Sequence, residues 1–272
     1  MKRASEYRTR ARISLAGQYG TAAGARAVAG FTMAIASLLM TLVFVFTIIG
    51  LKSALSVDRD GGVPFFAVFF SITIAALLIL VWVAQCLLEG GLLKIVHKVY
   101  CREEVALRDM FYGFKGKAPW RILGISIMTS LMEGALMVPY FVCSVLFRLG
   151  SGMSPAALFA TIVTYVLAIS GVFVISLHFG LALYALMDCP ELGAVDCMRA
   201  SLRLTKKRRW KYLCLQLSFI GWLLLGQLSL GIGLFWIIPY MQCTTFHFYE
   251  DLKAEKEAMG VAWRPEPARI SE

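Results

Sequence analysis

Charged residues are scarce in this chain. Asp, Glu, Lys and Arg make up 16% of its 272 residues, whereas 59% are hydrophobic. A soluble domain is usually about 25% charged and about 45–50% apolar, so most water-soluble enzymes are excluded. An intrinsically disordered chain is excluded too, because such chains are poor in apolar residues. The composition therefore indicates a protein embedded in a membrane.

Motifs for metal, nucleotide or nucleic-acid binding are also lacking. The chain has only three histidines, and its seven cysteines form neither a CxxC pair nor zinc-finger spacing. It contains no phosphate-binding loop ending in GK[ST] and no HExxH motif. Residues 113–116 match the GxxG clamp of one RNA-binding module but not its surrounding fold. We therefore expect no metal, no cofactor, no nucleic-acid partner and no enzymatic activity, with the cysteines reduced and structural.

Long apolar runs are what the sequence has instead. A helix needs about 20 mostly apolar residues to cross the hydrocarbon core, and backbone groups in lipid must be hydrogen-bonded within the span. We expect an all-α fold, a polytopic transmembrane bundle over residues 30–249. The last two spans are one stretch divided at 229–231, because a single helix over 212–249 would overshoot the bilayer. The six expected spans are 30–51, 64–88, 122–147, 156–187, 212–228 and 232–249.

The excess of basic residues orients these spans. The N-terminal segment 1–29 has six Lys and Arg, the loops 89–121 and 188–211 have seven each, and the tail 250–272 has four. The intervening loops have three of the 27. Because Lys and Arg gather in cytoplasmic loops, we expect the N-terminal segment and the C-terminal tail to be cytoplasmic.

The two large basic loops are alike. Each has apolar residues at helical spacing, at 107–114 and at 192–202, followed by a run of cations with one tryptophan. This pattern predicts a short amphipathic helix at the cytoplasmic interface, then contacts with anionic head groups. A weaker echo at 13–19 suggests three repeats of interfacial helix plus hairpin, although any protein with positive cytoplasmic loops shows similar features. The expected lipid contacts are Lys115, Lys117, Trp120, Arg121, Lys206, Lys207, Arg208, Arg209, Trp210 and Lys211. Asp188 and Glu191 have the spacing of a capping box.

Several stretches resemble one bacterial family of integral membrane proteins, the domain of unknown function number nine-seven-five. The resemblance is strongest over 184–252 and also covers 107–114. It implies a polytopic protein of the bacterial plasma (inner) membrane without an established activity, so it assigns a role to no residue. The residues that carry it are the stretches 184–190 and 218–222, then Gly231, Gly233, Trp236, Pro239, Tyr240, Thr244, Phe248 and Tyr249.

Glu133 is the only charged side chain inside the six expected spans. An ionisable group within the membrane usually faces the bundle interior and is a functional candidate. His178 lies at a similar expected depth, roughly 14 Å from the inner end of its span against roughly 16 Å for Glu133. The two could form a hydrogen-bonded intramembrane site. The alternative is a protonated Glu133 bonded to its own helix.

Three functional hypotheses follow. The favoured one is a non-enzymatic scaffold or envelope-maintenance protein whose basic loops contact anionic phospholipid or a membrane-protein partner. The alternative is a small transporter or permease component with a midplane site near Glu133 and His178. For a third class, an intramembrane enzyme acting on lipid, the sequence offers no set of catalytic residues.

Overall fold

The computed structural model describes residues 4–57, 65–149 and 155–264, and these ranges contain helices and no strand. The expected all-α fold is confirmed. In chain order, the helices are α1 (Ala4–Leu15), α2 (Tyr19–Val57), α3 (Phe65–Tyr100), the 3₁₀ helix η1 (Leu107–Phe114), α4 (Ala118–Leu149), α5 (Pro155–Phe179), α6 (Ala182–Asp188), α7 (Ala194–Thr205), α8 (Arg209–Leu217), α9 (Ile220–Leu228) and α10 (Leu234–Ala258).

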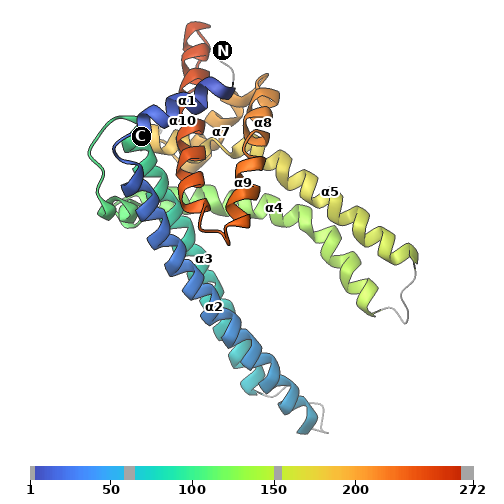
Figure 1. The fold of residues 1–272 in the computed structure, drawn as a ribbon. Helices are drawn as coiled ribbons and strands as arrows, with labels where there is room; N and C mark the ends of the chain where they lie inside the picture. Colours follow the sequence, from blue (N-terminus) through green and yellow to red (C-terminus); the bar gives the residue numbers. More distant parts are fainter. Residues whose placement is uncertain (1–3, 58–64, 150–154, 265–272) are drawn as a thin grey trace, which may run out of the picture.

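Two long hairpins project from a helical base (Figure 1). Helices α2 and α3 form one hairpin, α4 and α5 form the other, and the two diverge as they leave the base. The base consists of α1, α6, α7, α8 and α10 packed around the roots of both hairpins. A third, shorter hairpin is formed by α9 and the beginning of α10. The name base is used below for α1, α6, α7, α8 and α10 together with the roots of the two long hairpins.

The long hairpins are packed against other helices where they leave the base, and their side chains are exposed farther out. The 39 residues of α2 extend about 58 Å at 1.5 Å per residue, well beyond the ~30 Å of a hydrocarbon core. At the root of α2, Ala22, Ala25 and Ala29 are buried, because small residues let helices approach closely. Farther out, large apolar side chains such as Leu38 and Leu80 are exposed by about 60%. Such surface is typical of a membrane-spanning segment.

Helix α10 is the centre of the base. Its residues Cys243, Phe246, Phe248 and Tyr249 are at most 1% exposed. Phe246 contacts the rings of His97 and Tyr100 on α3 and that of Tyr184 on α6. The apolar character of 239–249, part of the expected span 232–249, therefore serves packing within the protein.

Five helical segments in the described ranges have the length and composition of a membrane span. The sixth expected span, 232–249, is not among them. Most of its residues form the first part of α10, which continues to Ala258 and has charged residues in its second half. The expected tail 250–272 is thus helical as far as Ala258. The five segments are Tyr19–Val43, Ile72–Tyr100, Ala118–Phe147, Pro155–Asp188 and Arg209–Leu228.

Candidate functional site

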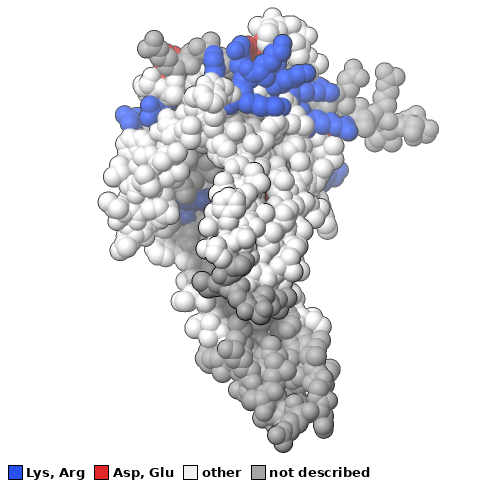
Figure 2. Space-filling view, turned by 90° about the vertical axis from the view of Figure 1, so that its right-hand side faces the viewer, with Lys and Arg blue, Asp and Glu red and all other residues white. Residues whose placement is uncertain are grey.

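The base is the basic end of the molecule. Lys and Arg gather there on the face seen in Figure 2, whereas the described part of the hairpin below it is largely uncharged. Two exposed tryptophans are next to basic residues in the chain, Trp120 at the start of α4 with 79% exposure and Trp210 at the start of α8 with 73%. Exposed tryptophan beside lysine and arginine is typical of the boundary between membrane and water.

The expected lipid contacts differ in their environment. Lys115, Lys117, Lys206, Lys207, Arg209 and Lys211 are exposed, and Arg121 is half-buried. Arg208 instead binds Glu255 of α10, with Nε donating to Oε1 at 3.0 Å and Nη2 contacting the same oxygen. This pair links the α7–α8 turn to α10. Arg208 therefore has a structural partner within the chain, which its place in a basic run does not reveal.

Helix η1 presents an apolar face outward. Leu107, Phe111 and Phe114 are each about half exposed, whereas Met110 is only 4% exposed. Glycine at position 91 lets η1 pack closely on α3, because a Cβ there would lie 1.7 Å from the Met110 carbonyl oxygen. The exposed face, close in sequence to Trp120, has the composition of an interfacial anchor.

Asp109 fixes the start of η1. Its Oδ2 accepts hydrogen bonds from the Ala106 amide and from Lys98 Nζ, both at 3.0 Å. Partial burial of the carboxyl opposes ionisation, but these two donors outweigh it and lower the pKa of Asp109 below its usual value. The carboxylate therefore ties η1 to the root of α3.

Helix α7 corrects the expectation for the second loop. It begins at Ala194 with Gly193 as N-cap, not at the expected capping box, and its apolar face is buried in protein. Leu192 and Met198 are at most 9% exposed, while Val195 is exposed by 43%. Helix α7 thus packs its apolar face against other helices of the base. Of the two helices, η1 alone exposes most of its apolar residues.

Asp188 has a different role from helix capping. It ends α6, and its Oδ2 accepts hydrogen bonds from Lys253 Nζ at 2.8 Å and from the Tyr249 hydroxyl at 3.1 Å. Burial lowers the pKa of Lys253, but the hydrogen bond and charge of Asp188 outweigh it and raise that pKa above its usual value. The Lys253 ammonium also lies 5.5 Å from the Trp263 ring centroid.

The Glu133–His178 pair stays a prediction. The α4–α5 hairpin packs Leu136 against Gly171 and Tyr140 against Tyr165, a register that places Glu133 opposite residues near 173. His178 lies near the end of α5, and its Nδ1 is 2.7 Å from the carbonyl oxygen of Val174 on the same helix. Its expected mid-membrane depth assumed a continuous helix to 187, whereas the chain turns at 180–181 before α6.

An ion pair, Arg26–Glu89, lies within the span candidates. Arg26 Nη1 contacts both carboxylate oxygens of Glu89 at 2.7 Å, joining the roots of α2 and α3. Sequence analysis placed both residues just outside the first two spans and so did not pair them. Among the described residues, no group of three or more His, Cys, Asp and Glu could hold a metal ion.

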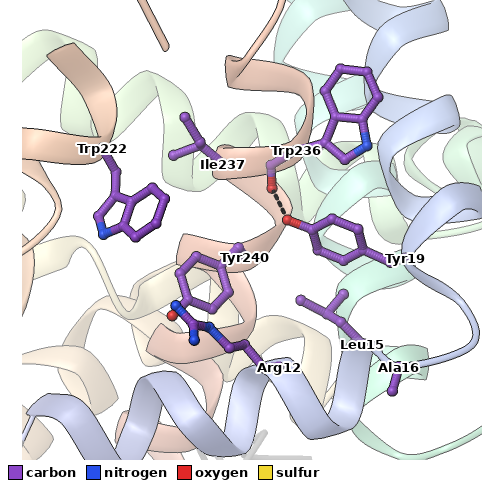
Figure 3. A pocket seen from close by; sticks show the side chains of 8 residues that line it. All are labelled: Arg12, Leu15, Ala16, Tyr19, Trp222, Trp236, Ile237 and Tyr240. Atoms are coloured by element: carbon purple, nitrogen blue, oxygen red, sulfur yellow. Dashed lines mark hydrogen bonds between the residues drawn. The ribbon is translucent and has the colours of Figure 1, made fainter. Parts of the chain in front are cut away.

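A pocket of about 370 Å³ lies between α1, the start of α2, α9 and α10 (Figure 3). The Arg12 guanidinium lies 5.7 Å from the Tyr240 ring centroid, and the Tyr19 hydroxyl donates to the Trp236 carbonyl at 2.9 Å. The Tyr240 side chain is buried, and its hydroxyl has no hydrogen-bond partner in the described part of the chain. Sequence reasoning missed this pocket because its walls come from both ends of the chain. The lining residues are Arg12, Leu15, Ala16, Tyr19, Trp222, Trp236, Ile237 and Tyr240.

Comparison with known proteins identifies the family and nothing narrower. Neither a curated protein nor a solved structure matches the chain. A family described as "Protein of unknown function (DUF975)" matches over residues 1–256, which include the base and both long hairpins. The match extends well beyond the 184–252 stretch where the resemblance is strongest. This chain therefore belongs to the DUF975 family of proteins of unknown function.

Proposed function

We propose that the protein is a non-enzymatic scaffold or envelope-maintenance protein of the bacterial plasma membrane, and that its basic end binds anionic phospholipid of the cytoplasmic leaflet. The gathering of exposed Lys and Arg at the base, with the exposed Trp120 and Trp210 next to such residues in the chain, carries this proposal. Anionic head groups attract each nearby cation by about 1 kcal/mol. Several cations on one rigid base would therefore enrich anionic lipid around the protein.

The proposed topology has both termini in the cytoplasm. Helix α1 packs on the second half of α10, where the Tyr7 hydroxyl donates to Asp251 at 3.0 Å and Arg10 lies 3.6 Å from the same carboxylate. The first and last described helices thus both belong to the base, which is the basic end. The base faces the cytoplasm by the positive-inside rule, and the α2–α3 and α4–α5 hairpins cross the bilayer.

The third hairpin enters the bilayer without crossing it. Its turn lies beside Gly30, where the rings of Phe31 and Phe235 are 5.6 Å apart, while α2 continues outward to Val57. The turn is apolar, with Leu228 exposed by 85% and Leu230 by 93%. All amides of residues 229–237 donate to acceptors within the hairpin. Lipid demands this internal hydrogen bonding of a buried turn.

Lipid selectivity tests the proposal. The full chain is reconstituted in phosphatidylcholine vesicles containing a minor fraction of phosphatidylglycerol, and electron paramagnetic resonance compares spin-labelled forms of both lipids at the protein surface. Wild type should favour the anionic lipid severalfold, and salt should weaken the preference. The variant with Gln at Lys115, Lys117, Lys206, Lys207 and Arg209 should lose most of it.

The matched control removes cations from the other end of the long hairpins. Lys52→Gln with Arg148→Gln changes residues near the outer ends of α2 and α4, and the preference should remain at the wild-type level. An unchanged preference in the base variant, or an equal loss in the control, would contradict the proposal.

A further inference from the structure

We propose that the pocket lined by Arg12 and Tyr240, the Arg12–Tyr240 pocket, binds a lipid that has one acyl chain and an anionic phosphate head group. This inference rests on the proposed function, because it places the pocket at the cytoplasmic leaflet. It goes beyond that function in assigning one defined lipid site to residues outside the two basic loops.

The head-group end of the pocket offers two donors. Figure 3 shows the Arg12 guanidinium beside the Tyr240 side chain, 5.7 Å from the centroid of its ring. Tyr240 is 6% exposed and its hydroxyl lacks a hydrogen-bond partner among the described residues, an unusual state for a buried polar group. Arg12 is exposed on a flexible side chain, and guanidinium pairs well with phosphate oxygens. The Tyr240 hydroxyl has almost no exposed surface, so a phosphate held by Arg12 would satisfy it once the Arg12 side chain moves aside.

The other end of the pocket suits an acyl chain. Leu15, Trp222, Trp236 and Ile237 supply apolar walls, and Trp222 and Trp236 are exposed by 38% and 46% on the lipid side. The volume of about 370 Å³ is at the lower end of the usual ~300–1,000 Å³ for ligand sites. It therefore accommodates a head and the first part of one chain. Leu225, one helical turn beyond Trp222 and 60% exposed, continues the apolar path into the membrane.

Packing holds the pocket in shape without a ligand. Phe219 and Trp222 both contact the Tyr240 ring edge-on, with centroids 5.8 Å and 6.5 Å away. The Tyr19 hydroxyl binds the Trp236 carbonyl at 2.9 Å, on the turn of α10 from which Pro239 removes a backbone hydrogen bond. The Tyr240 ring and the apolar walls are thus held in place before binding, which lowers the cost of ordering them.

Native mass spectrometry of the full chain in neutral detergent tests the site with lysophosphatidic acid as probe. Wild type should bind one molecule tightly and should bind lysophosphatidylcholine and glycerol 3-phosphate far more weakly. Tyr240→Phe should lower affinity about tenfold and Arg12→Gln more than that, with Arg12→Lys between wild type and Arg12→Gln. Arg8→Gln, one helical turn away on α1, is the control and should bind as wild type does.

Three results would overturn the site: equal binding by all pocket variants, equal binding of glycerol 3-phosphate, or equal binding of lysophosphatidylcholine. Thermal unfolding in the same detergent checks that Tyr240→Phe is folded. The base variant with five Gln substitutions separates the two proposals. If it loses phosphatidylglycerol preference while the pocket variants bind normally, the proposed function stands and the pocket inference fails. The opposite pattern supports the pocket and contradicts the role of the basic loops.

Discussion

Asp188 joins two helices of the base, α6 and α10. Its carboxylate joins the end of α6 to Tyr249 and Lys253 on α10, and its side chain is only 17% exposed. Lys253 is 22% exposed, so the ion pair is shielded from water on most sides. Removing one partner of such a pair leaves the other with an unmet hydrogen-bonding need.

Asp188→Asn should therefore lower the free energy of unfolding by about 2 kcal/mol. Thermal unfolding in detergent measures the change as a lower melting temperature. Asp196→Asn is the control, because Asp196 pairs with an Arg199 that is 62% exposed, and such surface pairs contribute little. Equal melting temperatures for Asp188→Asn and Asp196→Asn would show that the Asp188 contacts do not stabilise the base.

The same ion pair predicts the response to alkaline pH. The pKa of Lys253 is raised in the folded protein, so its stabilising effect is complete below the unfolded lysine value of about 10.4 and is lost as pH rises through the folded value. Wild type should lose melting temperature above that pH. Lys253→Met should lose less over the same interval, and parallel curves for both proteins would refute this assignment.

Sequence alone could not assign these residues. Asp188 and Glu191 have capping-box spacing, but the partners of Asp188 are more than sixty positions away on α10. Arg208 resembles its basic neighbours until Glu255, 47 positions later, is found beside it. Local spacing predicts local structure, whereas ion pairs of this kind depend on the packing of distant helices.

At the scale of an element, η1 shows how two backbones can pack without side chains between them. Cβ atoms on Gly91 and Gly113 would lie 1.7 Å and 2.1 Å from carbonyl oxygens of Met110 and Leu87. Neither carbonyl oxygen can move away at a small cost in free energy, because each belongs to a helical backbone. The two glycines are therefore required for η1 to rest on the root of α3.

Gly91→Ala should displace η1 and destabilise the protein by about 1–3 kcal/mol. Gly134→Ala on α4 is the matched control, since its Cβ would meet no atom within 4 Å and alanine favours helix. Thermal unfolding should give a lower melting temperature for the first variant and an equal or higher one for the second. A tolerated Gly91→Ala would mean that η1 is not closely packed on α3.

The elements themselves were largely predictable. The apolar runs lie in helices, and helices lie at two of the three expected places, η1 at 107–114 and α7 at 194–205. The third place, 13–19, instead contains the end of α1 and the turn before α2. What failed was the environment of α7, whose apolar residues at 192–202 were expected to face lipid. Amphipathic spacing identifies an apolar face, but burial of that face is favourable both in lipid and in the protein interior. The spacing therefore does not tell which of the two environments the face contacts.

At the scale of the whole molecule, composition predicted a membrane protein but not how deeply each run enters the bilayer. The stretch 212–249 is apolar enough for two spans, yet much of 232–249 is buried in the base, where α10 contacts α1, α2 and α3. Hydropathy cannot distinguish a helix surrounded by protein from one surrounded by lipid. The placement of the third hairpin therefore has to be tested directly.

Leu230→Cys tests it with a membrane-impermeant maleimide added to intact spheroplasts. If the third hairpin ends within the bilayer, this cysteine should stay unlabelled, because the reagent cannot enter hydrocarbon. Gly61→Cys, between α2 and α3, should be labelled from outside, and Glu257→Cys near the end of α10 only after permeabilisation. The unsubstituted chain gives the background from its native cysteines. Labelling of Leu230→Cys as fast as Gly61→Cys would place the turn outside the cell and restore six complete crossings, since the turn would then have passed through the whole membrane.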